Sequence, residues 1–115
     1  MDYKKELEEL ILTVIRESGS DLHLGVGKVP AIRVSGELIF LLKRHPLTEE
    51  DVIGILGEIL DKAKLNKFTE EQEMDFSYDF RGEARLRGNA FFQKGLISVA
   101  LRLVPKVKSL EELHL

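Results

Sequence analysis

Two arginines, Arg87 and Arg102, carry guanidinium groups and are spaced so that they could act together on one ligand. Each lies in a segment where apolar and polar residues alternate, and Lys94-Gly95 between the segments predicts a two-residue hairpin turn. That register pairs apolar residues or glycine with one another on one face, and it places Arg87 directly across from Arg102 on the other. Two adjacent guanidinium groups repel each other and suit an external anion, phosphate above all. The alternative is that both arginines extend separately into solvent.

The strand expected before Arg87 decides what could neutralise this pair. A three-residue turn at Arg81-Gly82-Glu83 sets Asp79 across from Arg85, and Ser77 across from Arg87. Arg85 therefore has a carboxylate opposite it, and a surface ion pair explains it as well as a functional role does. The arginine pair itself has no carboxylate directly opposite in this register, which makes it the stronger candidate for an anion site.

Other chemistry has little support in the sequence. No P-loop, zinc-protease motif, nucleophile elbow or calcium loop occurs, and there is no Cys. The three histidines, His23, His45 and His114, lack ligand spacing, and we expect His23 to be a hydrogen-bonded structural residue. We expect structural roles for Asp75 and Asp79 as well. The sequence therefore predicts neither a complete active site nor a metal site.

Composition indicates one small globular domain. The chain has 115 residues, of which 43% are hydrophobic and 32% charged, with a formal net charge of -3. This balance argues against a dedicated nucleic-acid binder. No apolar run approaches the roughly 20 residues of a membrane span, and the first residues lack a signal-peptide core. We therefore expect a cytoplasmic protein that binds no nucleic acid and has no membrane span.

The remaining patterns supply the elements that position the arginines. Apolar residues at helical spacing predict helices at 7–15, 48–60 and 62–68, the first ended by Gly19 and the second begun by a capping box at Thr48. Period-2 alternation predicts strands at 22–26, 29–34, 37–41, 74–80, 85–93 and 97–103. This order predicts an α+β fold, an antiparallel sheet of about six strands with helices packed on one face.

Several of these segments together resemble a known family. Residues 20–24, 27–38, 74–78, 84–91 and 100–105, in this order, resemble the N-terminal domain of the type IV pilus retraction ATPases, in the type II/IV secretion ATPase family. Residues 109–113 look like the segment that leads into that family's motor domain. Gly88 and Gly19 depart from the pattern, which has a valine-like residue and alanine there. The resemblance covers essentially the whole chain.

The resemblance implies an architecture and a role for the arginines. It implies a PAS-like domain at 1–105 and, at 106–115, the start of a linker to a RecA-like motor domain that is absent from this chain. ATP and Mg²⁺ are implied as cofactors of the complete ATPase and none for this chain, which would not itself be an enzyme. Arg87 and Arg102 would act as arginine fingers on the nucleotide, with Arg85 as a weaker contact.

The resemblance also implies partners and a location. The partners would be the domain's own motor domain, neighbouring subunits of a homohexamer, and the pilus base machinery at the cytoplasmic face of the inner membrane. The process would be pilus retraction and twitching motility, with a related pilus or secretion motor left open. An alternative from another class is a stand-alone PAS-like module that binds a small ligand or a protein and has no nucleotide role.

Overall fold

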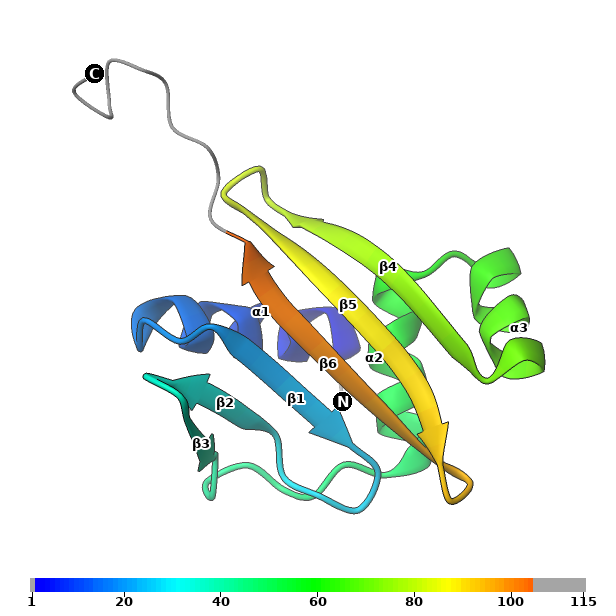
Figure 1. Cartoon of the computed structure of the whole chain (residues 1–115), viewed down its shortest axis with the longest axis horizontal. Helices are drawn as coiled ribbons and strands as arrows, with labels where there is room; N and C mark the ends of the chain where they lie inside the picture. Colours follow the sequence, from blue (N-terminus) through cyan, green and yellow to red (C-terminus); the bar gives the residue numbers. More distant parts are fainter. Residues whose placement is uncertain (1, 105–115) are drawn as a thin grey trace.

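Six strands form a single antiparallel sheet in the computed structural model, which describes residues 2–104. In chain order they are β1 (Asp21–Gly25), β2 (Ala31–Val34), β3 (Glu37–Phe40), β4 (Glu73–Phe80), β5 (Ala84–Gln93) and β6 (Leu96–Val104). Across the sheet the order is β3-β2-β1-β6-β5-β4. Two groups of three consecutive strands therefore meet in the middle, where β1 pairs with β6 although they are far apart in the sequence (Figure 1).

Helices cover one face of this sheet. They are α1 (Tyr3–Arg16), α2 (Glu49–Ile59) and α3 (Lys62–Glu71). Figure 1 shows α1 and α2 behind the sheet and α3 beside β4, and no element in residues 2–104 covers the front face. The expected capping box begins α2, because the Asp51 N–H donates to Thr48 Oγ1 and the Thr48 N–H donates to Asp51 Oδ2. The α+β class, with an antiparallel sheet and packed helices, is confirmed.

The covered face and the helices enclose one apolar core. Its members include Leu7, Leu10, Ile11 and Val14 of α1, Val52, Ile55 and Leu56 of α2, Phe68 of α3, and Leu22, Leu24, Ile32, Phe80, Leu86, Ala90, Val99 and Leu101 of the sheet. The strand members recur at every second residue, as the alternation predicted. Packing against the helices therefore fixes which side chains remain on the uncovered face.

Two details of the sequence prediction differ from the structure. The first helix ends at Arg16, and Ser18 with φ 56°, not Gly19, has the left-handed conformation that follows it. Ile15, expected on the buried stripe, is 38% exposed, whereas its neighbour Val14 is buried.

The expected turn at Lys94-Gly95 is present, with positive φ at both residues. None of the helices in residues 2–104 is long and apolar enough to cross a membrane. The expected linker at 106–115 and His114 lie outside the described residues.

Candidate anion site on the uncovered sheet face

A row of mostly charged side chains crosses the uncovered face from strand to strand. It consists of Arg33 on β2, Asp21 on β1, Arg102 on β6, Arg87 on β5 and Ser77 on β4, each directly across from the next. We call these residues the charged row. The predicted pairing of Arg87 with Arg102 is confirmed by the register of β5 and β6. The sheet therefore holds the two guanidinium groups on adjacent strands.

Asp21 is a member of this row that the sequence patterns did not indicate. Its Oδ2 lies 3.6 Å from Nε of Arg102, and it also accepts a hydrogen bond from Oγ of Ser20. The Asp21 side chain is only 12% exposed, whereas that of Arg102 is 73% exposed. The expectation that no carboxylate lies opposite the pair was therefore wrong for Arg102. The predicted hairpins gave only the pairing of β6 with β5, whereas β1, which carries Asp21, pairs with the other side of β6.

Arg87 differs from Arg102 in this respect. Among residues 2–104, no carboxylate oxygen lies within 4.0 Å of its guanidinium nitrogens, and Ser77 faces it across β4 as predicted. Among these residues, the partly buried carboxylate of Asp21 therefore contacts Arg102 and not Arg87.

The other expected polar residues flank the row. Arg85 lies across from Asp79, as predicted, but in residues 2–104 the two form no ion pair. Asp75 accepts a hydrogen bond from Nδ2 of Asn89 at 2.7 Å, which links β4 to β5 and does not involve Arg85. No group of three or more His, Asp or Glu residues in this part of the chain could hold a metal ion.

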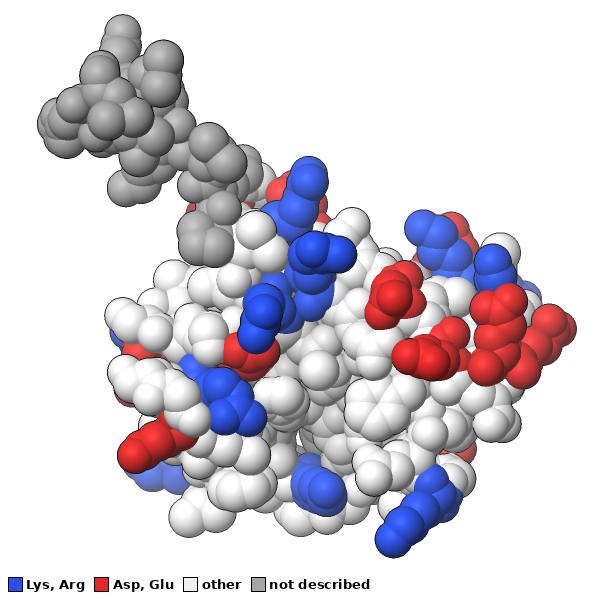
Figure 2. Space-filling view, in the orientation of Figure 1, with Lys and Arg blue, Asp and Glu red and all other residues white. Residues whose placement is uncertain are grey.

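A hollow of about 300 Å³ adjoins the arginine pair. Arg87, Arg102, Asp21, Asp75 and Asn89 line it, and the small side chain of Ala100 leaves it open. Figure 2 shows Lys and Arg side chains gathered in the upper middle of this face, with Asp and Glu side chains over β4 and α3. Guanidinium groups bind carboxylate or phosphate through parallel N–H donors, so this hollow is suited to an anion.

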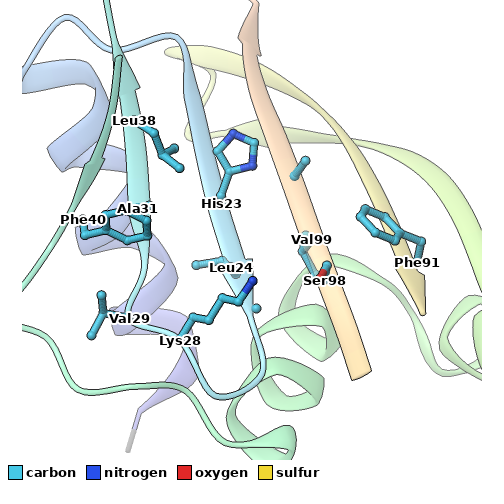
Figure 3. A pocket seen from close by; sticks show the side chains of 12 residues that line it. His23, Leu24, Lys28, Val29, Ala31, Leu38, Phe40, Phe91, Ser98 and Val99 are labelled. Carbon is cyan, nitrogen blue, oxygen red and sulfur yellow. The ribbon is translucent and has the colours of Figure 1, made fainter. Parts of the chain in front are cut away.

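A second hollow, of about 240 Å³, lies farther along β1 and β6. Figure 3 shows His23 in it, with Leu38 and Phe40 on one side and Phe91 on the other. Small residues of the neighbouring strands, such as Ala31 and Ala100 directly across from His23, leave this space open. We call it the histidine hollow.

The histidine itself is not satisfied as expected. Nε2 of His23 is buried and has no hydrogen-bond partner among residues 2–104, so the expectation of a hydrogen-bonded structural histidine was wrong for that atom. Burial lowers the pKa of His23 below its ordinary value of 6.5; nearby Asp21 acts against this change and Arg33 adds to it. Uncharged imidazole is therefore the favoured form in the fold.

Paired arginines on an uncovered sheet face are groups that could bind an anion. No family model matches the sequence. The chain is 35% identical over 109 residues to the type IV pilus retraction ATPase PilT of Pseudomonas aeruginosa and 33% identical over 115 residues to the type IV pilus ATPase PilU of the same organism. These matches cover 94% and 96% of this chain but only 31% and 29% of the relatives.

The structure agrees with these relationships. A crystal structure of the pilus retraction motor PilT with bound ADP matches 91% of this chain and 31% of its own, with a TM-score of 0.78 and 33% identity. The ATPase DotB of Legionella pneumophila shares the fold at 20% identity, with a TM-score of 0.73 over 92% of this chain and 31% of its own. Nearly the whole chain is thus similar, in sequence and in fold, to the N-terminal domain of PilT-like ATPases. The chain spans about a third of the length of the relatives it matches.

Proposed function

We propose that this chain serves as the N-terminal domain of a PilT-like ATPase that powers type IV pilus retraction, and that it contributes Arg87 and Arg102 to the ATP held by a motor domain. The observation that carries this proposal is the direct pairing of the two arginines on the uncovered face. The names of the relatives support the motor assignment. The proposal includes a homohexameric ring, Mg²⁺ with the nucleotide, and work at the cytoplasmic face of the inner membrane with the pilus base machinery.

The contacts of Arg102 suit such a role. Asp21 lies near Nε of Arg102, which leaves the two terminal nitrogens of this guanidinium for phosphate oxygens. Phosphoryl transfer spreads negative charge over the γ-phosphate oxygens, so a guanidinium placed there stabilises the transition state more than the ground state. The carboxylate thus orients the arginine without occupying its outer donors.

By itself, this chain should show no ATP hydrolysis above background and only weak affinity for nucleotide. The sequence has no P-loop, so it lacks the backbone cradle and lysine that bind the phosphates in P-loop ATPases. ATP hydrolysis that copurifies with this chain and persists in Arg87→Ala would contradict the proposal that a separate motor domain holds the ATP.

A chimera tests the proposal directly. Residues 2–104 would replace the matched segment of Pseudomonas aeruginosa PilT, and the unmodified chimera must first hydrolyse ATP. Arg87→Ala and Arg102→Ala should then lower the rate by roughly 10³–10⁵, the range for arginine fingers, and Arg→Lys should be nearly as damaging because lysine lacks the planar fork. Arg85→Ala should have a smaller effect.

Arg16→Ala, at the end of α1, is the matched control, because it removes a guanidinium from outside the charged row. Each variant should remain fully folded under the conditions of the assay. Normal hydrolysis by the Arg87 and Arg102 variants would refute the assignment of the arginines.

The histidine hollow favours a second candidate function, a module that binds a small ligand or a protein side chain without any nucleotide role. It is largely apolar and contains one buried, unpartnered imidazole nitrogen. Normal ATP hydrolysis by the Arg87 and Arg102 variants of the chimera would support this candidate. Loss of hydrolysis in variants that remain folded would instead support the proposal that the two arginines act on the ATP of the motor domain.

A further inference from the structure

The two edges of the sheet differ in composition. The outer strand β4 carries Glu73, Asp75 and Asp79 on the uncovered face. The other outer strand, β3, carries exposed apolar side chains at Leu38, Ile39 and Phe40, of which Phe40 is 51% exposed. Charged residues protect an edge strand from pairing with other chains, whereas an exposed apolar edge invites pairing. The β3 edge is therefore the one open to a partner strand.

The backbone of β3 is also oriented for pairing. The Leu41 N–H donates to the carbonyl oxygen of Pro30 at 2.9 Å, so Leu41 faces the β2 side. Because successive residues of an antiparallel strand alternate in direction, Leu38 and Phe40 turn their amide groups outward. No strand in residues 2–104 pairs with them there. The Phe40 carbonyl accepts from the Leu42 N–H at 3.0 Å and retains a second lone pair.

We propose that β3 pairs antiparallel with β3 of a second copy of this chain, about a two-fold axis at Ile39. This register sets Leu38 of one copy across from Phe40 of the other, so the residues with outward amide groups form the hydrogen-bonded pairs. It also sets Ile39 across from Ile39 of the second copy. All of these cross-strand pairs are apolar, and the dimer joins two sheets into one.

Charge at the strand ends favours the same partner. In this register Glu37 of each copy lies across from Leu41 of the other, beside the turn that carries Lys43. The two-fold axis repeats this opposite-charge arrangement at both ends. A β4 edge paired with its own copy would instead bring acidic residues together. Because β3 has only four residues, the interface is small, and we expect a weak dimer with a micromolar to millimolar dissociation constant.

Sedimentation equilibrium of the 115-residue chain over a concentration series tests the dimer. Phe40→Lys should weaken association at least tenfold, because it places a charge in the apolar pair. Leu96→Lys is the matched control, since Leu96 is 50% exposed at the β5–β6 turn, away from β3. A monomer at all concentrations up to the millimolar range, or an equal loss in the Leu96 variant, would overturn the proposal.

Cysteine crosslinking tests the register, because the chain has no Cys of its own. Residues across from each other in a non-hydrogen-bonded antiparallel pair have Cα atoms about 4.5 Å apart, which a disulfide can span. Ile39→Cys should therefore give far more disulfide-linked dimer on mild oxidation than Leu96→Cys. Equal yields from the two variants would contradict pairing about Ile39.

Mixing two variants with reversed charges gives an independent test of whether the partner is a second copy of the chain. Glu37→Lys and Lys43→Glu should each weaken self-association. An equimolar mixture of the two variants should recover it, because each Lys at one strand end then meets a Glu from the other copy. Failure of the mixture to associate better than either variant alone would count against the second copy as the partner.

Discussion

The two faces of the sheet are built from the same strands, yet different forces fix their side chains. On the covered face, Leu86 and Leu101 are fully buried against the helices. On the uncovered face, Arg87 and Arg102 occupy neighbouring positions in the same two strands and remain exposed. The space between the sheet and the helices therefore limits which side chains fit on the covered face. On the uncovered face, the charge of a side chain and its exposure to solvent determine what it can bind. Substitutions should reveal this difference as a loss of stability on one face and a loss of binding or hydrolysis on the other.

The largest expected contrast is between two phenylalanines. Phe80 ends β4 in the core with 0% exposure, and Phe91 stands on the uncovered face as a wall of the histidine hollow. Phe80→Ala should lower the free energy of unfolding by about 3–5 kcal/mol, because it leaves a cavity that the helices cannot fill. Phe91→Ala should cost less than about 1 kcal/mol, since its ring is partly solvated. Urea denaturation of both variants measures the contrast, and equal losses would remove the distinction between the faces.

Gly88 offers a sharper test of packing on the covered face. A Cβ at this position would overlap the ring of Phe76 and lie 2.8 Å from Cδ2 of Leu101. Gly88→Ala should therefore lower the free energy of unfolding by about 1–3 kcal/mol, the usual cost of overpacking. Gly57→Ala is the control, because a Cβ there meets nothing within 4 Å and should stabilise α2 by about 0.5–1 kcal/mol.

Chemical denaturation of the double variant Gly88→Ala/Phe76→Ala completes this test. The added methyl group should cost less once the Phe76 ring is gone, because the two side chains compete for the same space. A Gly88→Ala variant as stable as the parent would show that the covered face is less tightly packed than the distances indicate.

Local rules account for what the sequence predicted well. The turn at Lys94-Gly95 fixes the β5–β6 register, so the pairing of Arg87 with Arg102 followed from residues close in the sequence. The same holds for the pairing of Asp79 with Arg85. That register did not give an ion pair, because it places two Cα atoms opposite each other and leaves long, solvated side chains free to point elsewhere.

The features that the sequence did not predict depend on a long-range pairing. Asp21 reaches Arg102 only because β1 lies beside β6, and no turn connects those strands. The unpartnered nitrogen of His23 has the same origin, since the residues directly across from it are Ala31 and Ala100, which have no polar side chain. Alternation places His23 on the uncovered face, but it does not show which strands become its neighbours.

The arginine pair should give a smaller, asymmetric effect on stability. Arg102→Ala removes the cation next to the mostly buried Asp21, so it should cost up to about 1 kcal/mol, allowing for the exposure of Arg102. Arg87→Ala removes only repulsion and should be neutral or stabilising by a few tenths of a kcal/mol. In the Asp21→Asn background the cost of Arg102→Ala should disappear. A double-mutant cycle by urea denaturation measures this coupling, and identical effects of the two arginine variants would show that Asp21 does not distinguish them.

The smallest expected effect is a pH dependence that originates in the histidine hollow. Burial lowers the pKa of folded His23, with nearby Asp21 opposing and Arg33 reinforcing that change, while the unfolded chain keeps the ordinary value of 6.5. Between these two values the unfolded state binds more protons, so the stability contribution is complete above about pH 6.5 and is lost as the pH falls through the folded pKa. His23→Gln should therefore reduce the decrease in unfolding free energy between about pH 7.5 and about pH 5. Denaturation of both proteins at the two pH values isolates this residue from the other titrating groups, and a decrease of the same size in His23→Gln would show that His23 is protonated as readily in the fold as in the unfolded chain.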